Sequence, residues 1–285
     1  MTDIKNILVA LDLSDIDNTL IEYASFIADT LQVKKVYFVH NIKKHEISEL
    51  FEEQLKDINL DEIIGDELNE KVEEKFTSSV AWEVLISEDP YSESLINYIV
   101  NKYEIQLALI GNKNKIKGTG VVSGKLLRLL NCNILSIPKN AKPVISNIWA
   151  GTDFSSASNK VFEVAENLQQ ITLAKVKAVH VYTVPLQFSI YIPKEHLDLK
   201  IKNHLEEKYE KLIKKIGYKG ELTTEIIPGR DSGVAEKLRA KAESNKADLI
   251  IIGDKGRNTF SSLLIGSVTD ELFNQDLEIP LWIVK

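Results

Sequence analysis

Three glycines near the end of the chain have the spacing expected of a loop that holds a phosphate group. They form the string Gly253-x2-Gly256-x9-Gly266, which follows the apolar run DLIII and precedes the helical pattern SVTDELF. Glycine lets the main chain approach a ligand closely and present its amide hydrogens to an anion. A glycine after a strand is also ordinary turn chemistry. Three glycines at this spacing favour the phosphate interpretation.

Side chains beside these glycines add hydrogen-bond donors and positive charge. The helix expected after the third glycine has free N–H groups and a partial positive charge at its amino end. Ser267 and Thr269 carry hydroxyl groups that can donate to an anion, and Val268 lies between them. Lys255 and Arg257 can supply full positive charges. Together these groups suit a polyphosphate.

An aspartate follows the first apolar run of each half of the chain. Asp12 comes directly after ILVAL, and Thr152-Asp153 come directly after IWAG. Such an aspartate either caps the next helix or binds a ligand at the end of its strand. For Asp153 we favour ligand binding, because the glycine loop is expected at the same edge of the sheet. For Asp12 both interpretations stay open.

These residues belong to a sequence that repeats itself. Four blocks recur in the same order, 140 to 142 residues apart, and both halves end in an apolar run after a helical pattern. The paired blocks are 7–14 with 148–155, 36–40 with 176–180, 84–90 with 225–231, and 106–113 with 248–255, and the final apolar runs are 133–138 and 279–284. The chain is therefore a tandem duplication.

Each copy alternates short apolar runs with amphipathic helical patterns, in the order β-α-β-α-β-α-β-α-β. That alternation predicts two tandem α/β domains, each an open, mostly parallel five-stranded sheet with helices on both faces. We expect the domains at 1–141 and 142–285, joined through a linker at 139–146 that contains Pro143. A helix is expected at 195–216, ending at Gly217.

Two serines have the sequence signature of helix caps. Ser14 and Ser155 come just before the first amphipathic helical pattern of each half. A serine at the N-cap position accepts a hydrogen bond from a free N–H group of the first turn. We therefore expect Ser14 and Ser155 to cap these helices.

The string GDKG, nine residues and GS, together with TDFS after the first strand of its half, resembles the universal stress protein (UspA-like) family. The resemblance extends over nearly the whole chain, once per half, and includes the final strand that begins at Pro280. It implies a tandem two-domain member with an adenine nucleotide α-hydrolase-like, Rossmann-like fold. It also implies a stress-response or regulatory protein that binds ATP or AMP, alone or with Mg²⁺.

The resemblance also implies which residues bind. Asp153, with Thr152 beside it, and Val181 match the family positions that hold adenosine. The positions that match the ribose- and phosphate-binding loop are Gly253, Gly256, Gly266, Ser267 and Val268, with Thr269 adjacent. We add Lys255 to the expected site because of its positive charge. We expect no catalytic residue and no protein-bound metal.

The first half departs from this pattern. Its loop begins with Gly111, but the second glycine is replaced by Asn114. The third glycine is either Gly124 or, in the register that keeps the last helix at family length, Gly120. Asn41 stands where the second half has Val181. We therefore expect nucleotide binding in the second half, and a degenerate loop in the first.

The remaining chemistry-bearing residues favour structural roles. His40 and His180 lie at strand ends and have no second ligand at metal-binding spacing. Cys132 is the single cysteine, so no disulfide can form within the chain, which suits a reducing compartment. No signal peptide or membrane span is evident, and we expect a cytoplasmic protein. The charged stretch 61–75 has the pattern of a solvated helix face.

The composition bears on the possible partners. The formal net charge is -7, which argues against duplex nucleic acid as a partner. Two alternative functions stay open: a weak ATPase, and an interaction scaffold or binder of another small ligand such as a lipid or metabolite. We also expect the last strands of the halves to pair as an intramolecular pseudo-dimer, Trp282 and Ile283 against Leu135 and Ser136, with further homodimerisation as an open question.

Overall fold

The computed structural model describes residues 4–42, 59–112, 120–183, 194–229, 233–256 and 265–285. The chain divides into an N-terminal unit, Thr2–Val144, and a C-terminal unit that begins at Ile145 and ends at Lys285. The division falls in the segment 139–146, which also contains the expected boundary at 141/142. The expected pseudo-dimer stays a prediction.

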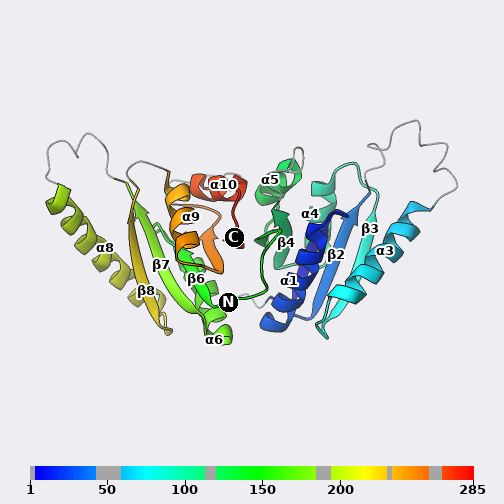
Figure 1. The fold of residues 1–285 in the computed structure, drawn as a ribbon, viewed down its shortest axis with the longest axis horizontal. Coiled ribbons are helices and arrows are strands. Elements are labelled where there is room, and N and C mark those ends of the chain that lie inside the picture. Colours follow the sequence, from blue (N-terminus) through cyan, green and yellow to red (C-terminus); the bar gives the residue numbers. More distant parts are fainter. Residues whose placement is uncertain (1–3, 43–58, 113–119, 184–193, 230–232, 257–264) are drawn as a thin grey trace. The chain divides into compact units, whose positions relative to one another are not determined.

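The N-terminal unit contains five parallel strands in the order β3-β2-β1-β4-β5 (Figure 1). Its elements along the chain are β1 (Asn6–Leu11), α1 (Ile16–Leu31), β2 (Lys35–Asn41), α3 (Leu60–Lys75), β3 (Ala81–Ser87), α4 (Ser92–Lys102), β4 (Leu107–Asn112), α5 (Gly120–Leu129) and β5 (Asn133–Pro138).

The C-terminal unit repeats this arrangement, with five parallel strands in the order β10-β9-β6-β7-β8. Its elements are β6 (Asn147–Gly151), α6 (Ala157–Thr172), β7 (Lys175–Tyr182), α8 (Lys194–Ile216), β8 (Leu222–Pro228), α9 (Val234–Ser244), β9 (Leu249–Gly253), α10 (Ser267–Asn274) and β10 (Leu281–Val284). The predicted element order, the parallel sheets and the duplication are confirmed.

The central strands are buried because helices cover both faces of each sheet. In the C-terminal unit α6 packs against α8 and α9 packs against α10, and Figure 1 shows α8 and α9 on opposite sides of the sheet. The four residues 249–252 of β9 are all buried. Such continuous apolar runs are typical of parallel strands covered on both faces.

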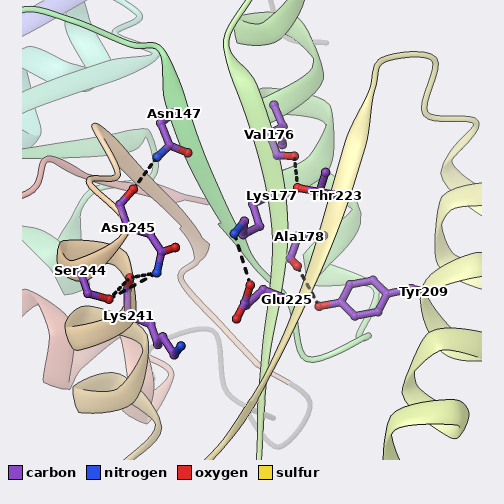
Figure 2. A network of polar contacts seen from close by, with 10 residues as sticks. All are labelled: Asn147, Val176, Lys177, Ala178, Tyr209, Thr223, Glu225, Lys241, Ser244 and Asn245. Carbon is purple, nitrogen blue, oxygen red and sulfur yellow. Dashed lines mark hydrogen bonds and ion pairs between the residues drawn. The ribbon is translucent and has the colours of Figure 1, made fainter.

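Tyr209 and Asn147 belong to a set of polar contacts that fastens two helices to the C-terminal sheet (Figure 2). The Tyr209 hydroxyl on α8 donates to the Ala178 carbonyl of β7 at 3.2 Å. Burial raises the pKa of Tyr209, so the hydroxyl keeps its proton and remains a donor. Asn147 Nδ2, at the start of β6, donates to the carbonyl of Asn245 at the end of α9 at 2.9 Å. These bonds fix the elements that surround the site.

The expected serine caps are wrong in both units. The N-cap residues are Asp15 for α1 and Ser156 for α6, one residue later than expected. Each turn contains a residue with left-handed backbone, Leu13 with φ 63° and Phe154 with φ 60°. This conformation, which sequence patterns do not reveal in a residue other than glycine, delays the start of the helix.

Two smaller predictions, the end of α8 and the solvated face of α3, are confirmed. Helix α8 ends at Ile216, and Gly217 follows with φ 67°. Helix α3 is solvated along most of its length, with Leu68 and Val72 buried. The thiol of Cys132 is buried. Of the helices in the described ranges, none combines the length and apolar character that crossing a membrane requires.

Candidate functional site

A cavity of about 560 Å³ lies at the carboxyl ends of strands β6, β7 and β9 of the C-terminal unit. From β6 the chain crosses to β7 on one side, and β9 pairs with the other side of β6. Ligands bind preferentially at such a switch point of a parallel sheet. All ten site residues predicted from the sequence line the cavity: Thr152, Asp153, Val181, Gly253, Lys255, Gly256, Gly266, Ser267, Val268 and Thr269.

The turn between β6 and α6 holds the Asp153 side chain in a fixed position. Its Oδ1 accepts hydrogen bonds from the Ser155 amide at 2.9 Å and from Ser158 Oγ at 3.0 Å. The Asp153 amide in turn donates to Ser158 Oγ at 3.3 Å. Thr152 is tied to β7, because its amide donates to the Val179 carbonyl at 2.9 Å. The carboxylate is therefore preorganised at the cavity wall.

His180 and His40 have the structural role expected of them. His180 Nδ1 lies 2.7 Å from the Thr152 carbonyl, and His40 Nδ1 lies 3.1 Å from the Leu11 carbonyl. Because a carbonyl only accepts, each Nδ1 must carry a proton. The His180 ring also packs against Phe154, with 4.7 Å between ring centroids. Within the described ranges, no three His, Cys, Asp or Glu side chains are arranged to hold a metal ion.

Hydrogen bonds join the two ends of the glycine loop. The Gly266 amide donates to the Asp254 carbonyl at 2.7 Å, and Thr269 Oγ1 donates to the Gly253 carbonyl at 2.7 Å. In this structure the Thr269 hydroxyl therefore donates to the main chain, and a hydrogen bond from it to a ligand stays a prediction. Ser267 at the start of α10 is exposed and keeps that role open. Arg257 lies outside the described residues.

The glycines occupy places where a side chain would collide with the site. A Cβ on Gly256 would lie 3.1 Å from Asp153 Oδ2, closer than nearly all real Cβ contacts. A Cβ on Gly253 would lie 3.2 Å from the Lys255 carbonyl. A Cβ on Gly266 would lie 3.4 Å from the Gly256 amide nitrogen. At these three positions the lack of a side chain therefore leaves room beside the main chain of the cavity lining.

Positive charge at the cavity comes from Lys255 and from the amino end of α10. Lys255 Nζ lies 3.6 Å from Asp254 Oδ2, and Lys285 Nζ lies 3.8 Å from the same oxygen. Lys255 lines the cavity, whereas its partner Asp254 is buried beside it. A cation and a helix amino end on one wall, with main-chain groups between them, suit an anionic ligand.

Sequence reasoning missed part of the lining. The additional residues are Gly151, Ser158, Val179, His180, Tyr182, Thr183, Val234, Leu238 and Ile252. Ser158 follows Asp153 by five residues, a spacing that brings the first turn of a helix back over the preceding strand end. Val234 and Leu238 lie four residues apart on one face of α9. Neither signal identifies a ligand site without knowledge of the sheet order.

The same place in the N-terminal unit has a larger side chain beside its first glycine. At the offset of 141 residues that relates the first paired blocks, Ile16 stands where the C-terminal unit has Ala157. A Cβ on Gly111 would lie 3.0 Å from the Cδ1 atom of Ile16, whereas a Cβ on Gly253 would lie 3.8 Å from the Cβ of Ala157. The larger side chain thus covers the end of β4, where the smaller one leaves room at the end of β9.

Two further exchanges make this place less suited to an anion. Asp17 replaces Ser158, is fully buried, and its carboxylate accepts from the amides of Leu13 at 2.8 Å and Asp12 at 3.2 Å. Asn41 replaces Val181 and bonds to the Asp89 main chain through both ends of its amide. The buried Asp17 and the hydrogen-bonded Asn41 therefore occupy the positions whose counterparts, Ser158 and Val181, line the cavity in the C-terminal unit.

The N-terminal loop register is also settled in part. Helix α5 begins at Gly120, as α10 begins just after Gly266. Gly124 lies inside α5 and cannot open the helix. This favours the register with Gly120 as the third glycine. Asn114 lies outside the described residues.

Comparison with known proteins places the C-terminal unit in a family. Residues 145–285 match the model of the "Universal stress protein family". A universal stress protein of Methanocaldococcus jannaschii is 28% identical over 165 residues, which is 56% of this chain and 94% of that protein.

Solved structures of similar length have the same fold. A putative universal stress protein from Pseudomonas aeruginosa UCBPP-PA14 aligns with a TM-score of 0.68 at 17% identity, over 99% of this chain and 93% of that one. A universal stress protein from Archaeoglobus fulgidus aligns with a TM-score of 0.64 at 16% identity, over 98% and 96%. At these identities the likeness extends to the fold alone.

Proposed function

We propose that the C-terminal unit, whose residues 145–285 match the universal stress protein family, binds an adenine nucleotide, ATP or AMP, in the cavity at the ends of β6, β7 and β9. One observation supports the proposal most strongly. Ten residues chosen from three separate stretches of the sequence line a single cavity at the switch point of the sheet. The volume of about 560 Å³ suits a ligand of nucleotide size.

The two ends of the cavity suit the two ends of a nucleotide. Asp153 and Val181 line the part formed by β6 and β7, where a carboxylate and an apolar side chain fit a ribose hydroxyl and a base. The glycine loop and Lys255 form the part where N–H groups and a cation fit phosphates. We propose that Mg²⁺, where present, is held by the nucleotide phosphates.

We propose binding without catalysis. Hydrolysis needs a base that positions and deprotonates a water molecule. Asp153, a carboxylate of the cavity lining, has Oδ1 committed to Ser155 and Ser158. We therefore expect a nucleotide-dependent regulatory protein, in which the bound nucleotide changes the stability or partner choice of the unit. Phosphate release from ATP at a rate that a Gly266→Asp substitution abolishes would show an ATPase instead.

Calorimetry with ATP, AMP and adenosine tests the proposed site. We expect one nucleotide per chain, and loss of binding in a Gly266→Asp variant, which adds a side chain and a negative charge beside Gly256. A Gly124→Asp variant in α5 is the matched control, because it adds the same charge on the N-terminal unit. A folded protein that binds no nucleotide at millimolar concentration contradicts the proposal and leaves a scaffold or another small ligand as the function.

A further inference from the structure

A buried carboxylate lies between two ammonium groups beside the cavity. Asp254 is 8% exposed. Its Oδ2 lies 3.6 Å from Lys255 Nζ and 3.8 Å from Lys285 Nζ. The main chain of Asp254 is fixed on both sides, because its amide donates to the Val284 carbonyl at 2.8 Å and its carbonyl accepts from the Gly266 amide. The carboxylate is thus anchored where β9, β10 and the glycine loop meet.

The two lysines differ in their surroundings. The Lys255 side chain is 33% exposed and lines the cavity. The Lys285 side chain is 12% exposed and follows the last strand. Lys255 can therefore turn toward a ligand in the cavity, whereas Lys285 is packed beside Asp254. The Lys255 ammonium can thus exchange Asp254 for a ligand, whereas the Lys285 ammonium stays beside Asp254.

We infer that Lys285 is a positioning residue that lets Lys255 leave Asp254 for the phosphates of a bound nucleotide. This inference rests on the proposed nucleotide site. A buried carboxylate that loses its cation is strongly destabilised, so Asp254 alone would hold Lys255 back. With Lys285 in place, Asp254 stays paired after Lys255 has turned to the ligand. Lys285 thus acts on the nucleotide through Asp254 without touching it.

The inference predicts that Lys285 affects the binding of nucleotides but not the binding of nucleosides. Adenosine has no anionic group, so its binding leaves the pair between Lys255 and Asp254 intact. ATP and AMP carry the charge that draws Lys255 away. Loss of Lys285 should therefore weaken binding of the nucleotides and leave adenosine binding unchanged, which general damage to the cavity would not do.

Calorimetry of Lys285→Met with ATP and with adenosine tests the inference in the full chain. We expect ATP binding to weaken by about five- to ten-fold, the scale of one partly buried ion pair, with adenosine affinity unchanged. The matched control is Lys160→Met. Lys160 Nζ donates to the Lys285 carbonyl at 2.9 Å, so this variant removes the same charge at the same strand end without removing a cation from Asp254. Lys285→Arg should restore ATP affinity.

The Asp254→Asn background completes the test. Without the carboxylate there is no charge to keep paired, so Lys285→Met should no longer weaken ATP binding there. Equal losses for ATP and adenosine, an equal ATP loss in both backgrounds, or an equal loss in Lys160→Met would each overturn the inference. If the unmodified chain binds neither ATP nor adenosine, the proposed function itself fails, which is a different result.

Discussion

The Thr269 hydroxyl donates a hydrogen bond of 2.7 Å to the Gly253 carbonyl and so joins the last residue of β9 to the first turn of α10. Thr269 is 3% exposed, so this bond is shielded from water. Its position explains why a residue adjacent to a glycine-serine motif need not touch the ligand. The hydroxyl holds the two ends of the loop together.

Thr269→Val should loosen the glycine loop. Valine keeps the shape of threonine but removes the donor, so the partly buried Gly253 carbonyl loses this bond at a cost of about 1 kcal/mol. We expect faster hydrogen exchange at the amides of Gly266 and Asp270, together with weaker ATP binding. Thr269→Ser keeps the donor and is the control. Unchanged exchange in the valine variant would show that the bond does not hold the loop.

Gly256→Ala should weaken nucleotide binding, because its Cβ would lie 3.1 Å from Asp153 Oδ2. That carboxylate is held by Ser158, so it cannot move away without breaking a hydrogen bond. Gly124→Ala is the matched control: its Cβ would have its nearest neighbour at 3.7 Å, and it lies inside a helix. We expect the control to bind ATP normally and to gain about 0.5–1 kcal/mol of stability. Equal ATP affinity in both variants would remove Gly256 from the site.

The sequence was sufficient for features that depend on local pattern. Element order, the parallel sheets and the end of α8 follow from apolar periodicity and from Gly217. The aspartate and glycine positions follow from their places after strands, and all of them reach one cavity. Such features need no knowledge of side-chain direction.

The features that the sequence did not predict depend on backbone conformation and side-chain orientation, which no residue pattern encodes. The left-handed backbone of Leu13 and Phe154 delays both helices, and this conformation is unexpected in large residues. The inward turn of the Thr269 hydroxyl is equally invisible in a linear motif. The offset of 141 residues pairs isoleucine at position 16 with alanine at 157. Only the structure shows that Ile16 packs against Gly111 and so covers the end of β4.

Exchanging these residues should close the C-terminal cavity. We expect Ala157→Ile with Ser158→Asp to abolish ATP binding, because the isoleucine would cover Gly253 and the aspartate would place an acid beside Asp153. The control is Asn159→Asp, which adds a negative charge on the next residue of α6 without changing a residue of the cavity lining. Calorimetry reports both affinity and stoichiometry. Two nucleotides bound per unmodified chain would contradict the assignment of binding to the C-terminal unit alone.

Asp17 should make the stability of the N-terminal unit depend on pH. Burial raises the pKa of this carboxyl above its ordinary value of 3.8, and the nearby charge of Asp12 adds to the effect, although the amides of Asp12 and Leu13 oppose it. The folded state therefore holds the proton more tightly than the unfolded state does. The contribution of Asp17 to stability then falls as pH rises from about 3.8 toward the raised pKa.

Asp17→Asn tests this, because asparagine keeps the shape and one acceptor oxygen but does not titrate. Guanidinium unfolding of both proteins at a series of pH values gives the difference in the free energy of unfolding, unmodified chain minus variant. We expect this difference to decrease as pH rises above about 3.8 and then to level off. Asp66→Asn on the exposed face of α3 controls for the loss of one negative charge. A difference that grows with pH would mean that the two amide donors outweigh burial and stabilise the ionised form.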